Sequence, residues 1–353
     1  MAYTDIDKSD DYFNTVLYTG NGTDNHAITG VNFQPDFVWI KPRNEARGHH
    51  LQDVIRGVNG ALITNETSAE YTGLTNVIKS FDSDGFTLGT SNDVNKSANT
   101  HVAWNWLADN TSGSSNTDGS ITSTVSANTT SGFSIVSYTG NGTAGATIGH
   151  GLGLTPKFII VKGRDTASNW QVGHSSLGWT QSIRLNQTGA SDSRTISWND
   201  TDPTSSVFSV GTDSDCNTNT NDYIAYCFAE KKGFSKFGSY TGNGDSSGNG
   251  PFIYTGFKPA WIMIKNASTG SSYWLMVDNK RDTFNVTTKK LYANINNGEF
   301  DDTHYNFDFL SNGFKLKSTS TTTNYNNSGD TYIYMCFAES PFTTSTGIPT
   351  TAR

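Results

Sequence analysis

The sequence has few cysteines and few charged residues for its length. Only three of its 353 residues are cysteine (Cys216, Cys227 and Cys336), and 16% are Asp, Glu, Lys or Arg. An odd and sparse set of cysteines argues against the disulfide framework of a small secreted protein. The polar start, residues 1–7, lacks the basic and apolar regions of a signal peptide. We therefore expect the chain to fold in a reducing cytoplasm.

Long apolar runs and basic clusters are also missing. No window approaches the roughly 20 apolar residues of a membrane-spanning helix. The longest basic runs are the pairs Lys231-Lys232 and Lys289-Lys290, and the formal net charge is −8. Because binding to nucleic acid requires a basic face, the sequence predicts neither a nucleic-acid partner nor a membrane partner.

The residues that are plentiful favour strands and turns. The chain has 35 glycines and 12% aromatic residues, and much of the remainder is Ser, Thr and Asn. Thr, Tyr and Phe suit a pleated sheet, whereas Gly and Asn suit tight turns. Lys, Glu and Leu, which favour long helices, are not abundant. The composition therefore predicts an all-β protein.

One five-residue motif, Tyr-Thr-Gly-Asn-Gly, occurs three times and reveals an internal repeat. The copies begin at Tyr18, Tyr138 and Tyr240, and their first glycines are Gly20, Gly140 and Gly242. We interpret these residues as structural: a strand runs into a tight turn, and the glycines supply a positive φ.

Two further signatures follow each copy at similar spacing. The first is a proline followed by a short apolar run and a lysine, over residues 35–41, 156–162 and 259–265. The second is an aromatic segment that closes the repeat, over residues 101–106, 223–230 and 332–339. Both read as strands, because they are too short for buried helices and rich in aromatic and β-branched residues. A fourth element, Phe-x-x-x-Gly-Phe, is present in the first and third copies and weakened in the second.

These spacings divide the chain into three repeats. We expect an N-terminal arm (1–11), repeat 1 (12–108), a linker (109–131), repeat 2 (132–230), repeat 3 (231–342) and a tail (343–353). Sixteen of the 23 linker residues are Ser, Thr or Asn, which is linker composition. Its second half alternates from Ile121 to Val125 and is compatible with an added edge strand. The predicted fold is three tandem β-sandwich modules of the jelly-roll or lectin-like kind.

An acidic residue with an Arg three positions later is the main catalytic candidate. Asp53-Arg56 and Asp278-Arg281 form such pairs in repeats 1 and 3, and His174 lies near this place in repeat 2. The pair is either a catalytic acid with its partner or an ion pair that pins a loop. We favour the ion pair, because a repeated pair is typical of scaffold and glycoside hydrolysis needs a second carboxylate. The sequence thus predicts no enzyme, no catalytic residue, no cofactor and no metal site.

Tryptophans outside the strand signatures are the candidates for ligand binding. Trp170 and Trp274 lie eight and nine residues after Lys162 and Lys265. An exposed indole can stack on a sugar ring through dispersion contacts. Their repeated position favours core packing instead, and stacking on a ligand is kept as the alternative.

Taken together, the repeated phrases resemble a known family. Tyr-Thr-Gly-Asn-Gly-Thr, Pro-Asp-Phe-Val-Trp-Ile-Lys, Phe-x-Ser-Asp-Gly-Phe and Tyr-Ile-Ala-Tyr-Cys-Phe-Ala-Glu are similar to a repeated domain of virion proteins from marine tailed bacteriophages. The resemblance covers nearly the whole chain and brings no catalytic residues. It implies a structural protein on the particle surface, either a tail fibre or appendage or a capsid decoration.

The same resemblance sets the expected partners and location. The chain would reside in the virion after assembly in the host cytoplasm, bind other virion proteins and form a homo-oligomer, for example a trimer. A host-surface glycan is a further candidate partner, for host attachment. The alternatives are a carbohydrate-binding adsorption module and, with less support, a polysaccharide depolymerase.

Overall fold

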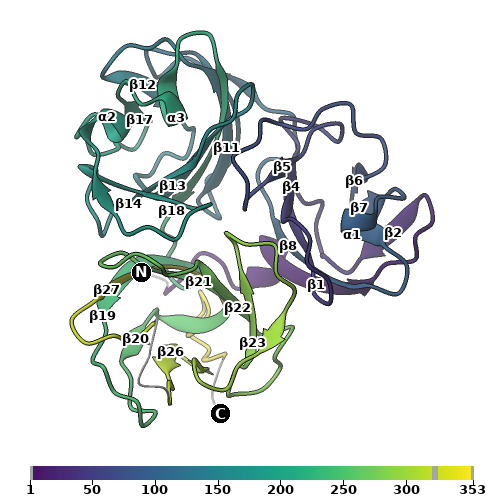
Figure 1. Ribbon diagram of the computed structural model, residues 1–353, viewed down its shortest axis with the longest axis vertical. Coiled ribbons are helices and arrows are strands. Elements are labelled where there is room, and N and C mark those ends of the chain that lie inside the picture. The colour runs from purple at the N-terminus through teal and green to yellow at the C-terminus, as the bar shows by residue number, and fades with distance from the viewer. Residues whose placement is uncertain (1–2, 320–324, 351–353) are drawn as a thin grey trace.

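The computed structural model describes residues 3–319 and 325–350, and antiparallel strands form nearly all of its regular structure. Three lobes, one for each repeat, surround a common centre (Figure 1). The described helices are single turns: η1 (Ser9–Asp11), α1 (Asn92–Asn95), α2 (Thr195–Trp198) and α3 (Ser214–Asn217). The prediction of an all-β protein is confirmed.

Each repeat builds a large sheet with the same spatial order of strands. The segment that closes the repeat in sequence lies inside the sheet, between the strand of the Tyr-Thr-Gly-Asn-Gly motif and the strand of the proline signature. In repeat 1 the order is β1 (Phe13–Thr19), β8 (Thr100–Trp106), β3 (Phe37–Pro42), β4 (His50–Asp53) and β5 (Leu62–Ile63).

The large sheets of the other two repeats extend this order. In repeat 2 it is β9 (Ser114–Asn116), β10 (Ser123–Asn128), β11 (Phe133–Thr139), β18 (Asp222–Ala229), β13 (Pro156–Gly163), β14 (Trp170–His174), β15 (Gln181–Arg184) and β16 (Asp192–Ser193). In repeat 3 it is β19 (Ser235–Thr241), β27 (Thr331–Pro341), β21 (Phe257–Asn266), β22 (Leu275–Asp278), β23 (Lys289–Tyr292) and β24 (Phe300–Asp301).

A small sheet accompanies each large one. The small sheets comprise β2 (His26–Thr29), β7 (Gly85–Leu88) and β6 (Ile78–Asp82) in repeat 1, β12 (Ala146–Gly149) and β17 (Val207–Val210) in repeat 2, and β20 (Phe252–Tyr254), β26 (Gly313–Leu316) and β25 (Phe307–Leu310) in repeat 3. The Phe-x-x-x-Gly-Phe element forms the hairpins β6–β7 and β25–β26. Where the element is weakened, in repeat 2, the small sheet has two strands instead of three.

The closing strands are buried on both faces, so each large sheet packs against one apolar core on each of its faces. On β18, Tyr223, Ala225 and Cys227 pack in the core of repeat 2, whereas Ile224, Tyr226 and Phe228 face the centre of the molecule. All three cysteines are free and buried, and buried free cysteine packs like a small apolar side chain. Strands covered on both faces lack the alternation of a sheet that has one face in water.

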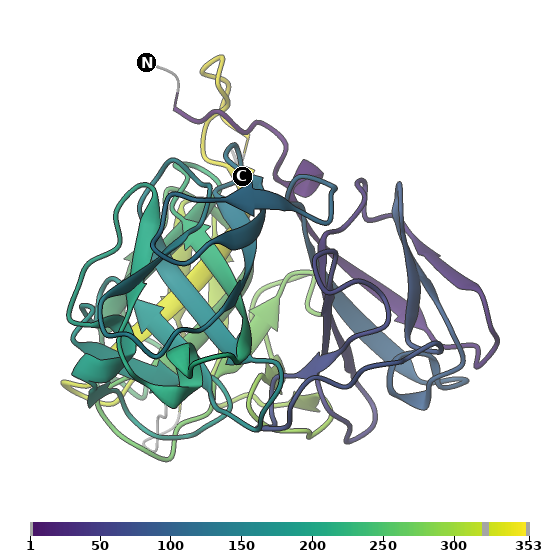
Figure 2. The ribbon, with the colours of Figure 1, turned by 90° about the horizontal axis from the view of Figure 1, so that it is seen from above.

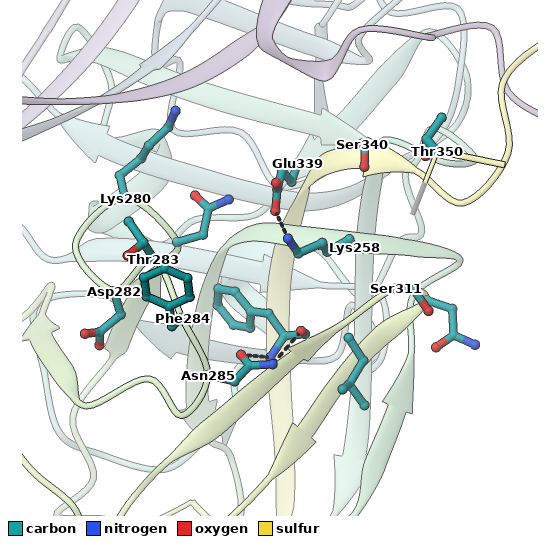
Figure 3. A pocket seen from close by; sticks show the side chains of 14 residues that line it. Lys258, Lys280, Asp282, Thr283, Phe284, Asn285, Ser311, Glu339, Ser340 and Thr350 are labelled. Carbon is teal, nitrogen blue, oxygen red and sulfur yellow. Dashed lines mark hydrogen bonds and ion pairs between the residues drawn. The ribbon is translucent and has the colours of Figure 1, made fainter. Parts of the chain in front are cut away.

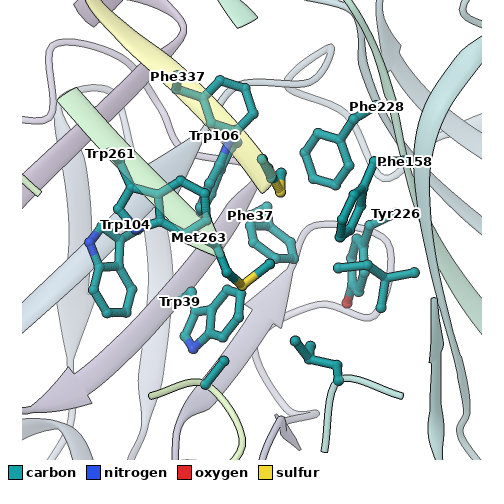
Figure 4. Close-up of a cluster of buried hydrophobic side chains, with 14 of the residues drawn as sticks. Phe37, Trp39, Trp104, Trp106, Phe158, Tyr226, Phe228, Trp261, Met263 and Phe337 are labelled. Carbon is teal, nitrogen blue, oxygen red and sulfur yellow. The ribbon is translucent and has the colours of Figure 1, made fainter. Parts of the chain in front are cut away.

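The second faces of the three large sheets meet in one central core. This central core contains aromatic residues of all three repeats, among them Phe37, Trp106, Phe228, Trp261 and Phe337 (Figure 4). Trp106 and Trp261 meet edge to face with ring centroids 5.7 Å apart, and Phe228 and Phe337 lie 6.0 Å apart. Such contacts add to the free energy of burying large apolar side chains. The repeats are therefore joined by a shared interior and not only by the chain that connects them.

The linker is part of the fold. Its residues 114–116 and 123–128 form β9 and β10, and β10 pairs with β11 along the large sheet of repeat 2. The edge strand that the alternation suggested is therefore present, but it extends to Asn128 and carries a second strand outside it.

The N-terminal arm and the C-terminal tail lie at the same end of the molecule (Figure 2). The Tyr3 hydroxyl donates to the carbonyl of Gly256 at 2.5 Å, and the backbone N–H of Ser345 donates to the Asp7 carboxylate at 2.6 Å. The N-terminal arm is thus held to repeat 3 through Tyr3, and the C-terminal tail is held to the arm through Ser345. Residues 1–2 and 351–353, which the sequence assigned to the arm and the tail, lie outside the described residues.

The Tyr-Thr-Gly-Asn-Gly motif forms the same lock in each repeat. The tyrosine hydroxyl donates to a backbone carbonyl, from Tyr18 to Val94 (2.7 Å), Tyr138 to Cys216 (2.7 Å) and Tyr240 to Tyr325 (2.9 Å). The next residue is a buried asparagine, Asn95, Asn217 or Asn326, whose side-chain oxygen accepts the N–H of the motif asparagine at 2.9–3.0 Å. The structural role predicted for these tyrosines fits this geometry.

The two glycines of the motif serve different purposes. The second glycine has a positive φ, +70° at Gly22, +68° at Gly142 and +71° at Gly244. The first glycine is required by close approach: a Cβ there would overlap a backbone carbonyl oxygen, that of Lys96, Thr218 or Asn327. The prediction that both glycines supply a positive φ therefore holds only for the second.

Candidate functional site

Trp170 and Trp274 are not available for stacking on a ligand. Their side chains are 0% and 1% exposed and belong to the central core. The Trp170 indole N–H donates to the carbonyl of Ile63 at 3.1 Å, and that of Trp274 donates to the carbonyl of Arg184 at 2.9 Å. Each tryptophan thus joins its own repeat to the preceding one. The ligand-stacking alternative is corrected to a packing role, because no face of either ring is open.

The acidic and basic residues weighed as catalytic candidates lie between repeats. Asp53 and Arg56 are both fully buried and form an ion pair at 2.6 Å, and Asp278 and Arg281 do the same. Each carboxylate also accepts a hydrogen bond from the next repeat, from the Tyr226 hydroxyl at 2.7 Å or from the Trp104 indole at 3.1 Å.

The repeat 2 counterpart, His174, makes the equivalent contact without a charge. Its Nε2 lies 3.2 Å from the carbonyl oxygen of Tyr334 in repeat 3. Burial lowers the pKa of His174 to about 4. Asp53, His174 and Asp278 therefore each contact the neighbouring repeat. This geometry favours the ion-pair interpretation over the catalytic one.

The lysine that ends each proline signature is a second residue repeated at these contacts. Lys41, Lys162 and Lys265 are fully buried. Their ammonium groups donate to carbonyls of the neighbouring repeat, Lys41 to Asn296 (3.2 Å), Lys162 to Thr67 (3.2 Å) and Lys265 to Thr188 (2.9 Å). Burial lowers the pKa of Lys41 and Lys265 to about 7 and that of Lys162 to about 8.

Two of the three contacts carry a further ion pair. Arg43 binds Glu299 at 2.7 Å between repeats 1 and 3, and Arg164 binds Glu70 at 2.6 Å between repeats 1 and 2. Between repeats 2 and 3 the corresponding residues are uncharged, and the Ser191 hydroxyl donates to the carbonyl of Ala267 at 3.0 Å. Repeated polar residues thus link all three lobes in a ring.

The candidate binding site is a pocket on repeat 3. It has a volume of about 920 Å³ and is lined by the loop 279–285, the turn 309–312 and residues near the C-terminal end of β27 (Figure 3). Lys258 and Glu339 form an ion pair at 2.6 Å in its wall. The Asn285 side chain holds the loop to the turn, because it donates to the carbonyl of Phe309 and accepts its N–H, both at 2.9 Å.

The loop beside this pocket is longer than its counterparts. Ten residues (279–288) separate β22 from β23, whereas eight (54–61) separate β4 from β5 and six (175–180) separate β14 from β15. The longer loop carries Phe284, whose side chain is 81% exposed. An extended loop with an exposed aromatic ring is typical of a binding site on a rigid scaffold.

The pocket presents several kinds of group that can contact a polar ligand. It combines an exposed ring with amide, hydroxyl, ammonium and carboxylate groups, which can stack on and hydrogen-bond to a polar ligand. Its two carboxylates are already engaged, since Glu339 pairs with Lys258 and Asp282 accepts the N–H groups of Thr288 and Lys289 at 2.6 Å. Across residues 3–319 and 325–350, no group of three or more His, Cys, Asp or Glu side chains is placed to hold a metal ion.

Sequence reasoning missed both Phe284 and the role of the lysines. A lysine ends the apolar strand in all three copies. Because surface lysines rarely recur at equivalent positions, this repetition could have predicted a structural role for them. The pocket left a weaker signal, the extra length between two signatures of repeat 3.

The fold and the site define an all-β protein with a three-lobed body, and in the described part of the chain no helix has the length and apolar character to cross a membrane. Residues 8–341 match a family described as a domain of unknown function, DUF7483, and the chain belongs to that family. The match runs through all three repeats. No curated protein matches the chain.

Proposed function

We propose that this chain is a structural protein on the surface of a bacteriophage particle, as a capsid decoration or as part of a tail fibre or appendage, where it binds other virion proteins. The observation that carries the proposal is the ring of three repeats around one core. The repeated charged and aromatic residues are engaged in holding the lobes together, as the three Lys, the Asp–Arg pairs and Trp170 and Trp274 demonstrate. Such a rigid body suits a particle component, and the family resemblance of the repeated motifs points the same way.

The proposal includes the finer architecture of each lobe. We propose that each repeat is a β-sandwich module of the jelly-roll or lectin-like kind, because an apolar core lies between its large and its small sheet. The ring also bears on the expected trimer: three equivalent lobes already surround a centre within one chain, so one copy can present threefold-like contacts to a partner.

The direct test is the protein content of purified particles. Mass spectrometry of virions from a phage that encodes this chain should find it in many copies, and electron microscopy should place it on the outer surface. Its absence from particles, or its presence only in infected-cell lysate, would reject the proposal.

A second candidate function, carbohydrate binding during host attachment, is favoured by the exposed Phe284 beside a polar pocket. Stacking on a sugar ring accounts for an exposed aromatic side chain on the extended loop better than packing does, since 81% of that side chain is exposed. A glycan array probed with the full chain should give binding that Phe284→Ala reduces by at least about tenfold, equivalent to about 1.4 kcal/mol.

The matched control is Phe252→Ala, which removes another exposed ring, 47% exposed, that is not among the pocket residues. It should leave glycan binding unchanged. Equal loss in both variants, or no glycan bound by the parent protein, would reject the carbohydrate proposal and leave the structural one intact.

A further inference from the structure

Equivalent strands of the three repeats have different surroundings. β1, β11 and β19 each pair with the closing strand of their own repeat in the same register, so Val16, Val136 and Gly238 correspond. In repeat 2 this strand has a second neighbour: β10 pairs with β11 from Ser123 opposite Tyr138 to Asn128 opposite Phe133. In the described part of the chain, β1 and β19 end their sheets and have no such neighbour.

The added strand completes the core of repeat 2. Val125 of β10 and Ile121, which lies just before β10, join that core and are 4% and 7% exposed. Beneath them, Val136 and Tyr138 are 0% and 3% exposed. In repeat 1, where no strand is added, the corresponding Val16 and Tyr18 are only half-buried. The apolar surface that β10 covers in repeat 2 is therefore partly open in repeat 1.

The two open edges differ in how they are protected. β19 carries Lys236, which pairs with Glu230 at 2.7 Å, and it has a glycine, Gly238, at the position of Val16. An edge lysine is a common device that keeps a sheet edge from pairing with another chain, and a glycine offers no side chain for an added strand to pack against. β1, with the sequence Phe-Asn-Thr-Val-Leu-Tyr-Thr, has no charge and no proline, and Leu17 is 40% exposed.

We propose that the β1 edge is a strand-acceptor site, which binds an extended segment of a partner protein by antiparallel pairing. The occupant is of the β10 kind: an uncharged, proline-free strand with small apolar side chains at alternate positions, as at Val125 and Ala127, and hydroxyl residues between them. Strand addition of this type takes its affinity from backbone hydrogen bonds and its specificity from the alternating side chains. That the partner is another virion protein rests on the proposed function, whereas the acceptor site itself does not.

The probe is the chain's own linker strand as a free peptide, residues 119–130, titrated onto the full-length protein. We expect saturable binding of one peptide per chain, with slowed hydrogen exchange at the amides of β1. A peptide carrying Ser126→Pro should not bind, because proline removes a backbone N–H that points toward the acceptor strand in the β10–β11 pairing. On the protein, Leu17→Lys should weaken binding by at least about tenfold, since an edge lysine opposes pairing.

Leu17→Lys should fold normally, because the corresponding residues in the other repeats are the polar Ser137 and Ser239. Its unchanged melting temperature is the check. No saturable binding would overturn the proposal, as would protection at β11, which would mean that the peptide replaces β10. A dimer that Leu17→Lys dissociates would assign the edge to a second copy and overturn the partner assignment. None of these results depends on finding the protein in particles, so the two proposals fail separately.

Discussion

At the scale of single residues, the positions that recur in all three repeats are those where local geometry accepts only one residue type. The motif tyrosine, the first glycine and the buried asparagine form one unit, because the glycine lets the turn approach the carbonyl after that asparagine. The motif was recognisable from identity alone. Its partner asparagine was not, since it lies 74 to 83 residues further along the chain.

The first glycine offers a sharp test of this unit. Gly140→Ala should lower the free energy of unfolding by about 1–3 kcal/mol, because the added methyl group overlaps the carbonyl of Thr218. Gly189→Ala is the matched control, with open space around its Cβ and no unusual φ, and should change stability by no more than about 0.5 kcal/mol. Denaturant unfolding measures both, and equal midpoints would contradict the close-approach explanation.

At the scale of elements, the strands were largely predictable from sequence. What packs against the second face of each large sheet was not. The proline and closing signatures form β3, β13, β21 and β8, β18, β27, as expected. The closing strand held a further signal: Tyr223, Ala225 and Cys227 on one face and Ile224, Tyr226 and Phe228 on the other are all apolar or aromatic. A sheet with two such faces must be covered on both sides. The sequence pattern therefore predicts a second core, but not that all three repeats share it.

The linker shows why composition alone misleads at this scale. Its Ser, Thr and Asn content is typical of a flexible connection, yet three apolar residues are enough to dock the segment on repeat 2, Ile121 just before β10 and Val125 and Ala127 within it. The hydroxyl residues are compatible with a strand because Thr favours sheets. The pocket on repeat 3 could not be predicted, because it depends on how two loops far apart in sequence meet.

The docking of β10 can be tested within the strand itself. Val125→Asp should lower the free energy of unfolding by about 2–5 kcal/mol, because it buries a carboxylate where an apolar side chain packs. Thr122→Asp, at an exposed position of the same segment, should change it by no more than about 0.5 kcal/mol. Thermal melts of the two variants make the comparison. A linker that does not belong to the fold would leave both unchanged.

At the scale of the whole molecule, three buried lysines tie stability to pH. In the unfolded chain a lysine keeps its proton up to its ordinary pKa of 10.5, whereas burial lowers the pKa of Lys41 and Lys265 to about 7 and that of Lys162 to about 8 in the folded protein. Between pH 7 and about pH 10 the unfolded state therefore binds more protons, so these groups make stability rise with pH. The loss of stability from burying a charged lysine is present below pH 7 and disappears as the pH rises and the buried lysines lose their protons.

Lys265→Met isolates one of these contributions. The variant should be less stable than the parent by about 1–3 kcal/mol near pH 9, since the carbonyls of Thr188 and Ser272 lose their donor. The difference should shrink toward pH 7, where the parent must bury a charged lysine. Free energies of unfolding at several pH values test this, and a difference that does not change with pH would contradict it.

The shared central core makes the three repeats one unit of folding. A chain of independent modules would unfold in steps, whereas lobes that bury Trp106, Phe228 and Phe337 against one another should unfold together. Differential scanning calorimetry of the full chain tests this most directly. The account predicts a single transition whose calorimetric and van't Hoff enthalpies agree. Two or three separable transitions would contradict it.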